Sequence, residues 1–101
     1  MPVLIRLETE TGVAVADTSD IHNVLTRRVD EGHGTQFAIL HMVDPWGTTA
    51  LNRLQVPLLL DDLEKLKEGA TIEDRATIQE VASLAERVLA EPHLHLKFYG
   101  D

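Results

Sequence analysis

Histidines are the side chains best suited to chemistry in this sequence. His93 and His95 stand two positions apart in a segment where they alternate with Leu94 and Leu96. On a β-strand this spacing projects both imidazoles from one face, where they can bind a metal ion if a neighbouring strand supplies a third ligand such as His41. The same alternation is typical of polar side chains on a solvent-facing sheet. The three histidines therefore predict one of two candidate functions, a small metal- or acid–base-dependent enzyme. It is the alternative to the leading hypothesis given below.

Other routes to catalysis lack the residues that they need. The chain contains no cysteine, which excludes thiol catalysis, thiolate metal sites and disulfides. Ser19 is expected at a helix start and Ser83 inside a helix, and neither lies in a strained, glycine-flanked turn. The segment 32–34 has too few glycines for a phosphate-binding loop, and no lysine follows it. We therefore assign no catalytic residue and expect no cofactor.

The single tryptophan, Trp46, lies in a predicted turn. Asp44, Pro45 and Gly47 occupy positions that these residue types prefer in a type I β-turn. A tryptophan at the tip of a hairpin is exposed, and exposed tryptophans commonly anchor protein–protein interfaces. The alternative is that Trp46 folds back over the sheet edge and packs against aliphatic side chains.

Acidic residues dominate the chain and concentrate in its second half. The formal net charge is 9 − 17 = −8, and residues 59–91 hold four bases against nine acids, 4 − 9 = −5. This charge opposes binding to nucleic acids and anionic membranes, whereas it attracts basic partners. The leading hypothesis is a non-enzymatic protein-binding module that occludes a basic partner surface. Its predicted partner-binding residues are Trp46, Asp61, Asp62, Glu64 and Glu68.

The hydrophobic pattern predicts about five strands. Apolar and polar residues alternate most clearly in the segments 3–8 and 93–99. In the segment 93–99 the even-numbered residues are apolar, and we expect them to point inward. A short strand is predicted at 13–16. The segment 36–43 is apolar on both sides, as in a central strand covered on both faces, and 48–54 is expected to return antiparallel to it.

Apolar residues at helical spacing predict three helices, at 21–29, 57–68 and 72–91. Thr18 or Ser19 is the expected N-cap of the first helix, and Pro57 suits the first turn of the second. Thr71 with Asp74 resembles a capping box for the third. The resulting order, β-β-α-β-β-α-α-β, predicts a single α+β domain over 1–101 with a mostly antiparallel sheet.

The predicted strand at 36–43 bears on assembly. Both of its apolar faces need cover, yet the two helices that are adjacent in sequence are expected to share one side of the sheet. The uncovered face predicts a homodimer through the sheet or its edge. In the alternative, the helix at 21–29 crosses to the second face and leaves a monomer.

Two segments, 43–49 continuing to 52–55 and the ending 96–101, resemble a pattern in small uncharacterised bacterial proteins. The size, acidity and α+β pattern also resemble those of immunity proteins, which neutralise bacterial toxins. That resemblance implies an inhibitor that covers its target, and it transfers no site residue. No apolar run reaches the roughly 18 residues of a membrane span, and no signal-peptide pattern opens the chain, so a cytoplasmic protein is expected.

Overall fold

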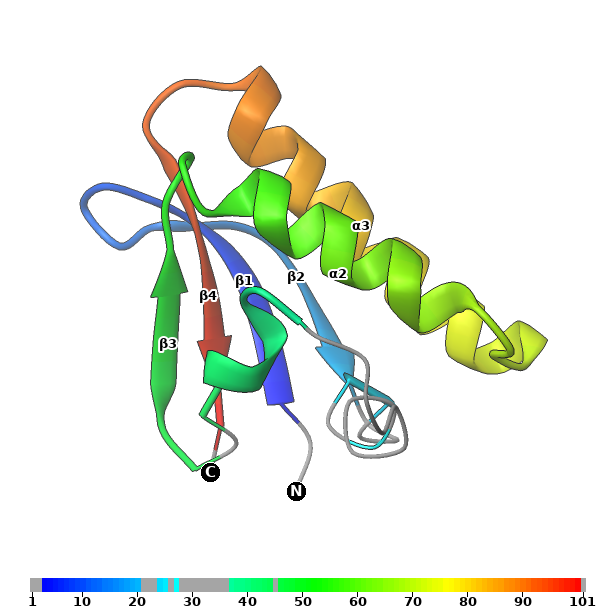
Figure 1. The fold of residues 1–101 in the computed structure, drawn as a ribbon. Helices are drawn as coiled ribbons and strands as arrows, with labels where there is room; N and C mark the ends of the chain where they lie inside the picture. Colours follow the sequence, from blue (N-terminus) through cyan, green and yellow to red (C-terminus); the bar gives the residue numbers. More distant parts are fainter. Residues whose placement is uncertain (1–2, 21–23, 26, 28–36, 45, 101) are drawn as a thin grey trace.

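Four antiparallel strands form one sheet in the computed structural model, which describes residues 3–20, 24–25, 27, 37–44 and 46–100. The strands are β1 (Val3–Thr9), β2 (Ala14–Asp20), β3 (Thr48–Leu51) and β4 (Leu94–Tyr99). Their order across the sheet is β2-β1-β4-β3 (Figure 1). The two central strands, β1 and β4, are the segments in which apolar and polar residues alternate most clearly. The predicted α+β class and antiparallel sheet are confirmed. The described residues contain no fifth strand, contrary to prediction.

Two helices, α2 (Val56–Lys67) and α3 (Ile72–Ala90), pack side by side on one face of the sheet (Figure 1). Both begin as predicted: Pro57 lies in the first turn of α2, and Thr71 Oγ1 accepts a hydrogen bond from Asp74 N–H at 3.1 Å. Gly69, at φ 72°, adopts the left-handed conformation in the turn between the helices. No helix within the described ranges is long and apolar enough to cross a bilayer.

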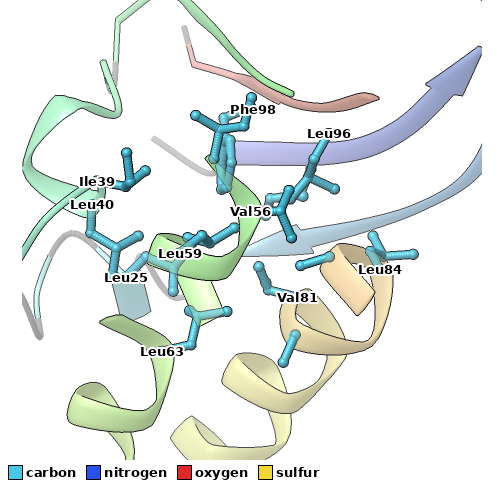
Figure 2. Packing of buried hydrophobic residues seen from close by; sticks show 14 of the residues in the cluster. Leu25, Ile39, Leu40, Val56, Leu59, Leu63, Val81, Leu84, Leu96 and Phe98 are labelled. Atoms are coloured by element: carbon cyan, nitrogen blue, oxygen red, sulfur yellow. The ribbon is translucent and has the colours of Figure 1, made fainter. Parts of the chain in front are cut away.

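The apolar core lies between these helices and one face of the sheet. The even-numbered residues of β4 are buried, as predicted, and Ile5 and Leu7 of β1 lie opposite Phe98 and Leu96. Figure 2 shows the side chains that pack against them from the helices: Val56, Leu59 and Leu63 of α2, and Val81 and Leu84 of α3. Within the part of the chain that the structure describes, neither α2 nor α3 covers the other side of the sheet. We call this side the open face; its central residues are Leu4, Arg6, Glu8, His95, Lys97 and Tyr99.

The predicted central strand at 36–43 is wrong. Its described residues form a loop and one 3-10 turn, η1 (Leu40–Met42). β3 therefore has no hairpin partner before it, and it pairs with β4 instead, with Thr49 opposite Phe98. The argument for a homodimer that used two apolar faces of a central strand loses its premise, and the oligomeric state stays a prediction.

Asp62 explains why this segment is not a strand. This residue of α2 is fully buried, and its carboxylate accepts hydrogen bonds from the N–H groups of Ala38, Ile39 and Leu40 at 3.0, 2.7 and 2.9 Å. N–H groups that bond one carboxylate are not available to a neighbouring strand. Because the backbone turns around the carboxylate, the consecutive residues Ile39 and Leu40 both reach the core (Figure 2). Hence the segment is apolar without strand alternation.

β2 is longer than the predicted strand at 13–16. Thr18 lies opposite Ile5 and Ser19 opposite Leu4, so neither caps a helix as expected. β-branched residues such as Thr18 suit a pleated strand. The predicted helix at 21–29 lies largely outside the described residues, although 24, 25 and 27 are helical.

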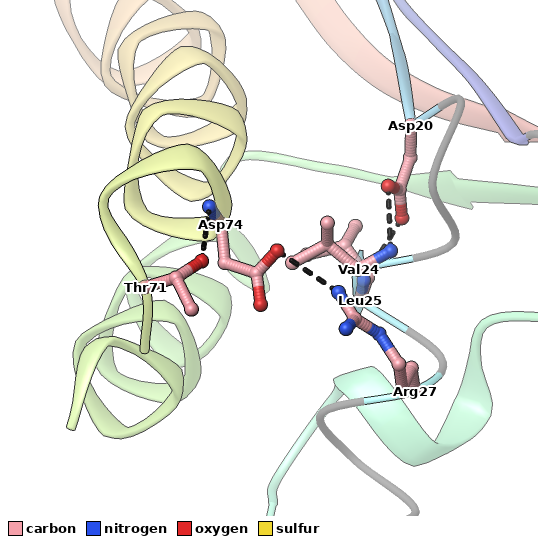
Figure 3. Close-up of polar contacts among 6 residues, drawn as sticks. All are labelled: Asp20, Val24, Leu25, Arg27, Thr71 and Asp74. Atoms are coloured by element: carbon pink, nitrogen blue, oxygen red, sulfur yellow. Dashed lines mark hydrogen bonds and ion pairs between the residues drawn. The ribbon is translucent and has the colours of Figure 1, made fainter. Parts of the chain in front are cut away.

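A second buried aspartate, Asp20, lies at the end of β2 and binds backbone beyond the strand. Its two carboxylate oxygens accept hydrogen bonds from the N–H groups of Val24 and Leu25 at 2.7 and 2.8 Å (Figure 3). Arg27 continues this segment and donates to Asp74 of α3 at 2.9 Å, as Figure 3 also shows. Arg27 is thereby tied to the first turn of α3.

Replacing Asp62 by alanine is expected to lower the free energy of unfolding by about 3–5 kcal/mol, because three backbone donors lose a charged acceptor together. Urea denaturation measures the change. Asp61→Ala is the matched control, since Asp61 is the adjacent, exposed carboxylate, and it should change stability by less than about 0.5 kcal/mol. Equal effects of the two substitutions would contradict the role given to Asp62.

Candidate functional site

Trp46 lies in a closely hydrogen-bonded turn before β3. Its N–H donates to Asp44 Oδ1 at 2.8 Å, and Gly47 N–H donates to the Asp44 carbonyl at 3.4 Å, which confirms the predicted turn. The Cβ atom of any other residue at position 47 would lie 2.7 Å from Asp44 Oδ2, which is too close. Glycine therefore leaves room for the Asp44 carboxylate. Gly100 N–H donates to the Gly47 carbonyl at 2.7 Å and fastens the turn to the end of the chain.

The Trp46 side chain is 70% exposed, so it does not fold back onto the sheet. The other aromatic residues are more enclosed: Phe98 is buried, and Phe37 and Tyr99 are half-buried. Hydrogen bonds on both sides of Trp46 hold its backbone in one conformation. A partner that binds this side chain therefore orders little that is not already ordered, which favours affinity.

The acids predicted to bind a partner are not all on the surface. Asp62 is buried beneath backbone donors and cannot contact a partner, so its assignment was wrong. Asp61 and Glu64 on α2, and Glu68 just after it, are exposed, as a partner-binding role requires. Glu64 also forms an ion pair with Lys67 at 3.0 Å.

Burial reduces the charge of the helical surface. Of the nine acids in residues 59–91, Asp62 and Asp74 are buried, so the remaining charges sum to 4 − 7 = −3 and not −5. Near the end of α2, acids and bases share an open depression of about 370 Å³, which is lined by Glu64, Lys65, Lys67, Glu68 and Arg75. The helical surface is therefore less acidic than the sequence predicted.

The open face carries a polar cluster centred on Glu8. Glu8 is only 2% exposed, although it belongs to an uncovered face, because neighbouring side chains enclose it. Tyr99 Oη donates a hydrogen bond to Glu8 Oε2, and Lys97 Nζ lies 3.3 Å from Glu8 Oε1. Arg6 lies opposite Lys97, with Nη1 3.9 Å from Glu8 Oε2 and its guanidinium 5.4 Å from the centre of the Tyr99 ring. One carboxylate thus contacts three side chains of the two central strands.

The charges of this cluster offset one another in part, because one carboxylate lies beside two cations. Arg6 and Lys97 are like charges facing each other across strands, which alone would destabilise the pair. The hydrogen bond from Tyr99, with the contacts to Lys97, holds the pKa of Glu8 below its ordinary 4.5 against the opposing effect of burial. The bond to Glu8, with burial, raises the pKa of Tyr99 above its ordinary 10.0. Neither group is poised for proton transfer near neutral pH, so the cluster suits strand pairing rather than acid–base catalysis.

Part of this cluster was accessible to sequence reasoning. The outward orientation of Arg6, Lys97 and Tyr99 follows from strand alternation, and the structure confirms it. The enclosure of Glu8 was missed, because it depends on the register between the first and last strands. The only hint of this enclosure in the sequence is that Glu8 lies two positions from Arg6 in the predicted strand, and this hint is weak.

The three candidate histidines do not converge. His93 precedes β4 at φ 63° and places Nδ1 3.0 Å from Glu10 Oε1, so it does not share a strand face with His95 as predicted. His95 lies on the open face opposite Glu8, whereas His41 is exposed in η1. Across the residues that the structure describes, no three histidine, aspartate or glutamate side chains gather as a metal site requires.

Comparisons with protein-family models, with curated proteins and with solved structures found no match for this chain. The resemblances to small bacterial proteins and to immunity proteins therefore stay predictions. The α+β fold with one open sheet face defines an architecture, which by itself does not define an activity. Function must be inferred from the geometry of the site, in which the fixed and exposed Trp46 is the most distinctive feature.

Tyr99→Phe is expected to lower the free energy of unfolding near pH 7 by about 1–3 kcal/mol, because it removes one hydrogen bond to a carboxylate and keeps the ring. The difference from the wild type should depend on pH. A lowered Glu8 pKa contributes stability above about 4.5 that is lost as the pH falls through the folded-state value. A raised Tyr99 pKa contributes stability below about 10.0 that is lost as the pH rises through its folded-state value.

Urea denaturation at several pH values should therefore show a gap between wild type and Tyr99→Phe that narrows at both acid and alkaline extremes. Glu10→Gln is the control, since Glu10 forms an exposed ion pair with His93, and it should change stability by less than about 1 kcal/mol. A gap of constant size across the pH range would argue against a bond that depends on ionised Glu8.

Proposed function

We propose that this chain is a non-enzymatic protein-binding module in which Trp46 is the apolar anchor. The supporting observation is a tryptophan that is 70% exposed on a turn fixed by hydrogen bonds. Burying an aromatic side chain removes about 150–250 Å² from water, a contribution of roughly 4–6 kcal/mol at about 25 cal/mol per Å². Tryptophans presented in this way are the side chains most often responsible for binding energy at interfaces.

Exposed acids on α2 give the module a preference for a basic partner. Asp61, Glu64 and Glu68 reach solvent, and the whole chain carries a net charge of −8. Long-range attraction would raise the association rate, while burial of Trp46 would set the lifetime of the complex. Binding that covers the partner's basic surface is the mode of action implied by the resemblance to immunity proteins.

Affinity capture from lysate of the source cells, followed by measurement of the dissociation constant of the captured partner, tests the anchor. Trp46→Ala should weaken binding about 30-fold or more, the level expected for a hot-spot tryptophan. Ile72→Ala is the matched control, because Ile72 is an apolar side chain 85% exposed at the start of α3. Binding that survives Trp46→Ala unchanged would contradict the proposal.

Charge reversal tests the steering. The double variant Asp61→Lys with Glu64→Lys should lower the association rate severalfold and reduce its dependence on salt, while the dissociation rate changes less. Glu73→Lys with Glu86→Lys alters the net charge equally on exposed positions of α3 and is the control. An association rate that responds to neither salt nor the α2 variant would exclude a basic partner.

A further inference from the structure

Asp44, the residue that fixes the Trp46 turn, is itself held in one orientation. Its N–H donates to Thr49 Oγ1 at 3.0 Å, and its carbonyl accepts a hydrogen bond from Gly47 N–H at 3.4 Å. Its carboxylate oxygen Oδ1 accepts from Trp46 N–H at 2.8 Å. The turn thus engages both backbone groups and one carboxylate oxygen of this exposed residue. The second carboxylate oxygen, Oδ2, is the one left for a donor from another molecule.

Within the part of the chain that the structure describes, no cation neutralises Asp44. None of the described lysines, arginines and histidines forms an ion pair with this carboxylate, and no described residue donates a hydrogen bond to Oδ2. The segment 36–52 contains neither lysine nor arginine. By contrast, the exposed acids Glu10, Glu64 and Glu91 each have a basic partner. Asp44 therefore presents a fixed negative charge without a counter-charge.

The Trp46 ring lies within reach of any ligand that binds this carboxylate. Covalent bond lengths place the centre of a tryptophan ring at most about 6 Å from the backbone nitrogen of the same residue. Since the Trp46 nitrogen is 2.8 Å from Asp44 Oδ1, the ring centre lies within about 9 Å of that oxygen in every rotamer. A cation interacts with an aromatic ring from up to about 6 Å, and a charged donor lies about 2.7–2.9 Å from a carboxylate oxygen. One extended cationic group can therefore contact both.

The chemistry of the two groups selects a guanidinium. The face of an aromatic ring attracts cations, and tryptophan does so most strongly. A guanidinium is planar, stacks on aromatic rings and carries five N–H donors in fixed directions, whereas an ammonium is a compact and strongly hydrated charge. An anionic ligand would be repelled by Asp44 and by the net charge of −8. A purely apolar ligand would cover the carboxylate without pairing it, which is unfavourable.

We propose that Trp46 and Asp44 together bind an arginine side chain of the partner protein, with the guanidinium stacked on the Trp46 ring and donating to Asp44 Oδ2. The inference rests on the proposed function, because it takes Trp46 as the anchor and names the group that the anchor contacts. It adds Asp44 as the residue that determines specificity. Asp61 and Glu64 attract a basic partner at long range, whereas Asp44 recognises one of its side chains.

Intrinsic fluorescence tests this site, because Trp46 is the only tryptophan of the chain. The probe is a tripeptide with arginine between two glycines and both ends blocked, titrated into the full chain. It should produce a saturable change in fluorescence with a dissociation constant in the millimolar range, because both contacts are open to solvent. The same peptide with citrulline, which has nearly the shape of arginine but no charge, should bind about fivefold more weakly or less well still.

The peptide with lysine in place of arginine tests the preference for a guanidinium. It should bind about two- to threefold more weakly than the arginine peptide, since an ammonium neither stacks on the ring nor offers donors in a plane. Equal binding of the arginine and citrulline peptides overturns the proposal. Stronger binding of the lysine peptide overturns the assignment to arginine. These comparisons use the natural chain, so they do not depend on the folding of a variant.

Asp44→Asn tests the carboxylate. Asparagine keeps a side-chain oxygen that can accept from Trp46 N–H, so the turn should persist while the charge is lost. Binding of the arginine peptide should weaken about fivefold or more. Asp61→Asn removes the same charge from an exposed position of α2 and is the matched control, with an expected change of less than about twofold. Equal weakening by the two variants would mean that net charge alone attracts the peptide, and it overturns the site.

Capture of the partner protein separates this inference from the proposed function. Both Trp46→Ala and Asp44→Asn should weaken capture. Capture that weakens with Trp46→Ala and not with Asp44→Asn overturns the arginine site and leaves the proposed function standing. Capture that neither substitution weakens overturns both.

Discussion

The arrangement of the core depends on the buried carboxylate of Asp62. This group lies inside α2, yet it holds three consecutive N–H groups of a segment more than twenty residues earlier in the chain. An ionised group without water is tolerated only when hydrogen bonds replace its hydration, and a turn of backbone donors does so. Asp20 binds the segment after β2 in the same way. Asp62 thus holds irregular backbone where a fifth strand was predicted, and Asp20 holds the helical residues Val24 and Leu25.

On the open face of the sheet, two like charges face each other across neighbouring strands. Its central pair, Arg6 and Lys97, would repel across the strands, and the single carboxylate of Glu8 reduces that repulsion while it accepts a hydrogen bond from Tyr99. The carboxylate is well paired, although Arg6 Nε is buried without a hydrogen-bond partner. An uncovered sheet face is often a binding surface, but here its charges are already committed to holding β1 and β4 together. Trp46, by contrast, lies off this face in the turn before β3 and is exposed.

The turns at the two ends of β3 are stabilised in the same way, by a side-chain oxygen that accepts a backbone hydrogen bond. Asp44 fixes the turn before the strand and Asn52 fixes the turn after it, each by accepting a backbone N–H with its side chain. Rigid turns hold Trp46 and Leu54 in water, although each would be more stable buried.

Local patterns in the sequence determined α2, α3, β1, β4 and the Trp46 turn, because helical periodicity, strand alternation, a Thr71 cap and an Asp44 turn each involve residues a few positions apart. The candidate site was predictable to the same extent: Trp46 was identified from its turn, and the outward side of β4 from its alternation. Only the tertiary structure decided that 37–43 is irregular, that Asp62 is buried and that Glu8 is enclosed by Tyr99. In each case the deciding bond joins residues far apart in the chain. Neighbouring residues do not identify the distant hydrogen-bond partner. An aspartate or glutamate that will be a buried acceptor therefore cannot be told apart, in the sequence, from one that will be exposed.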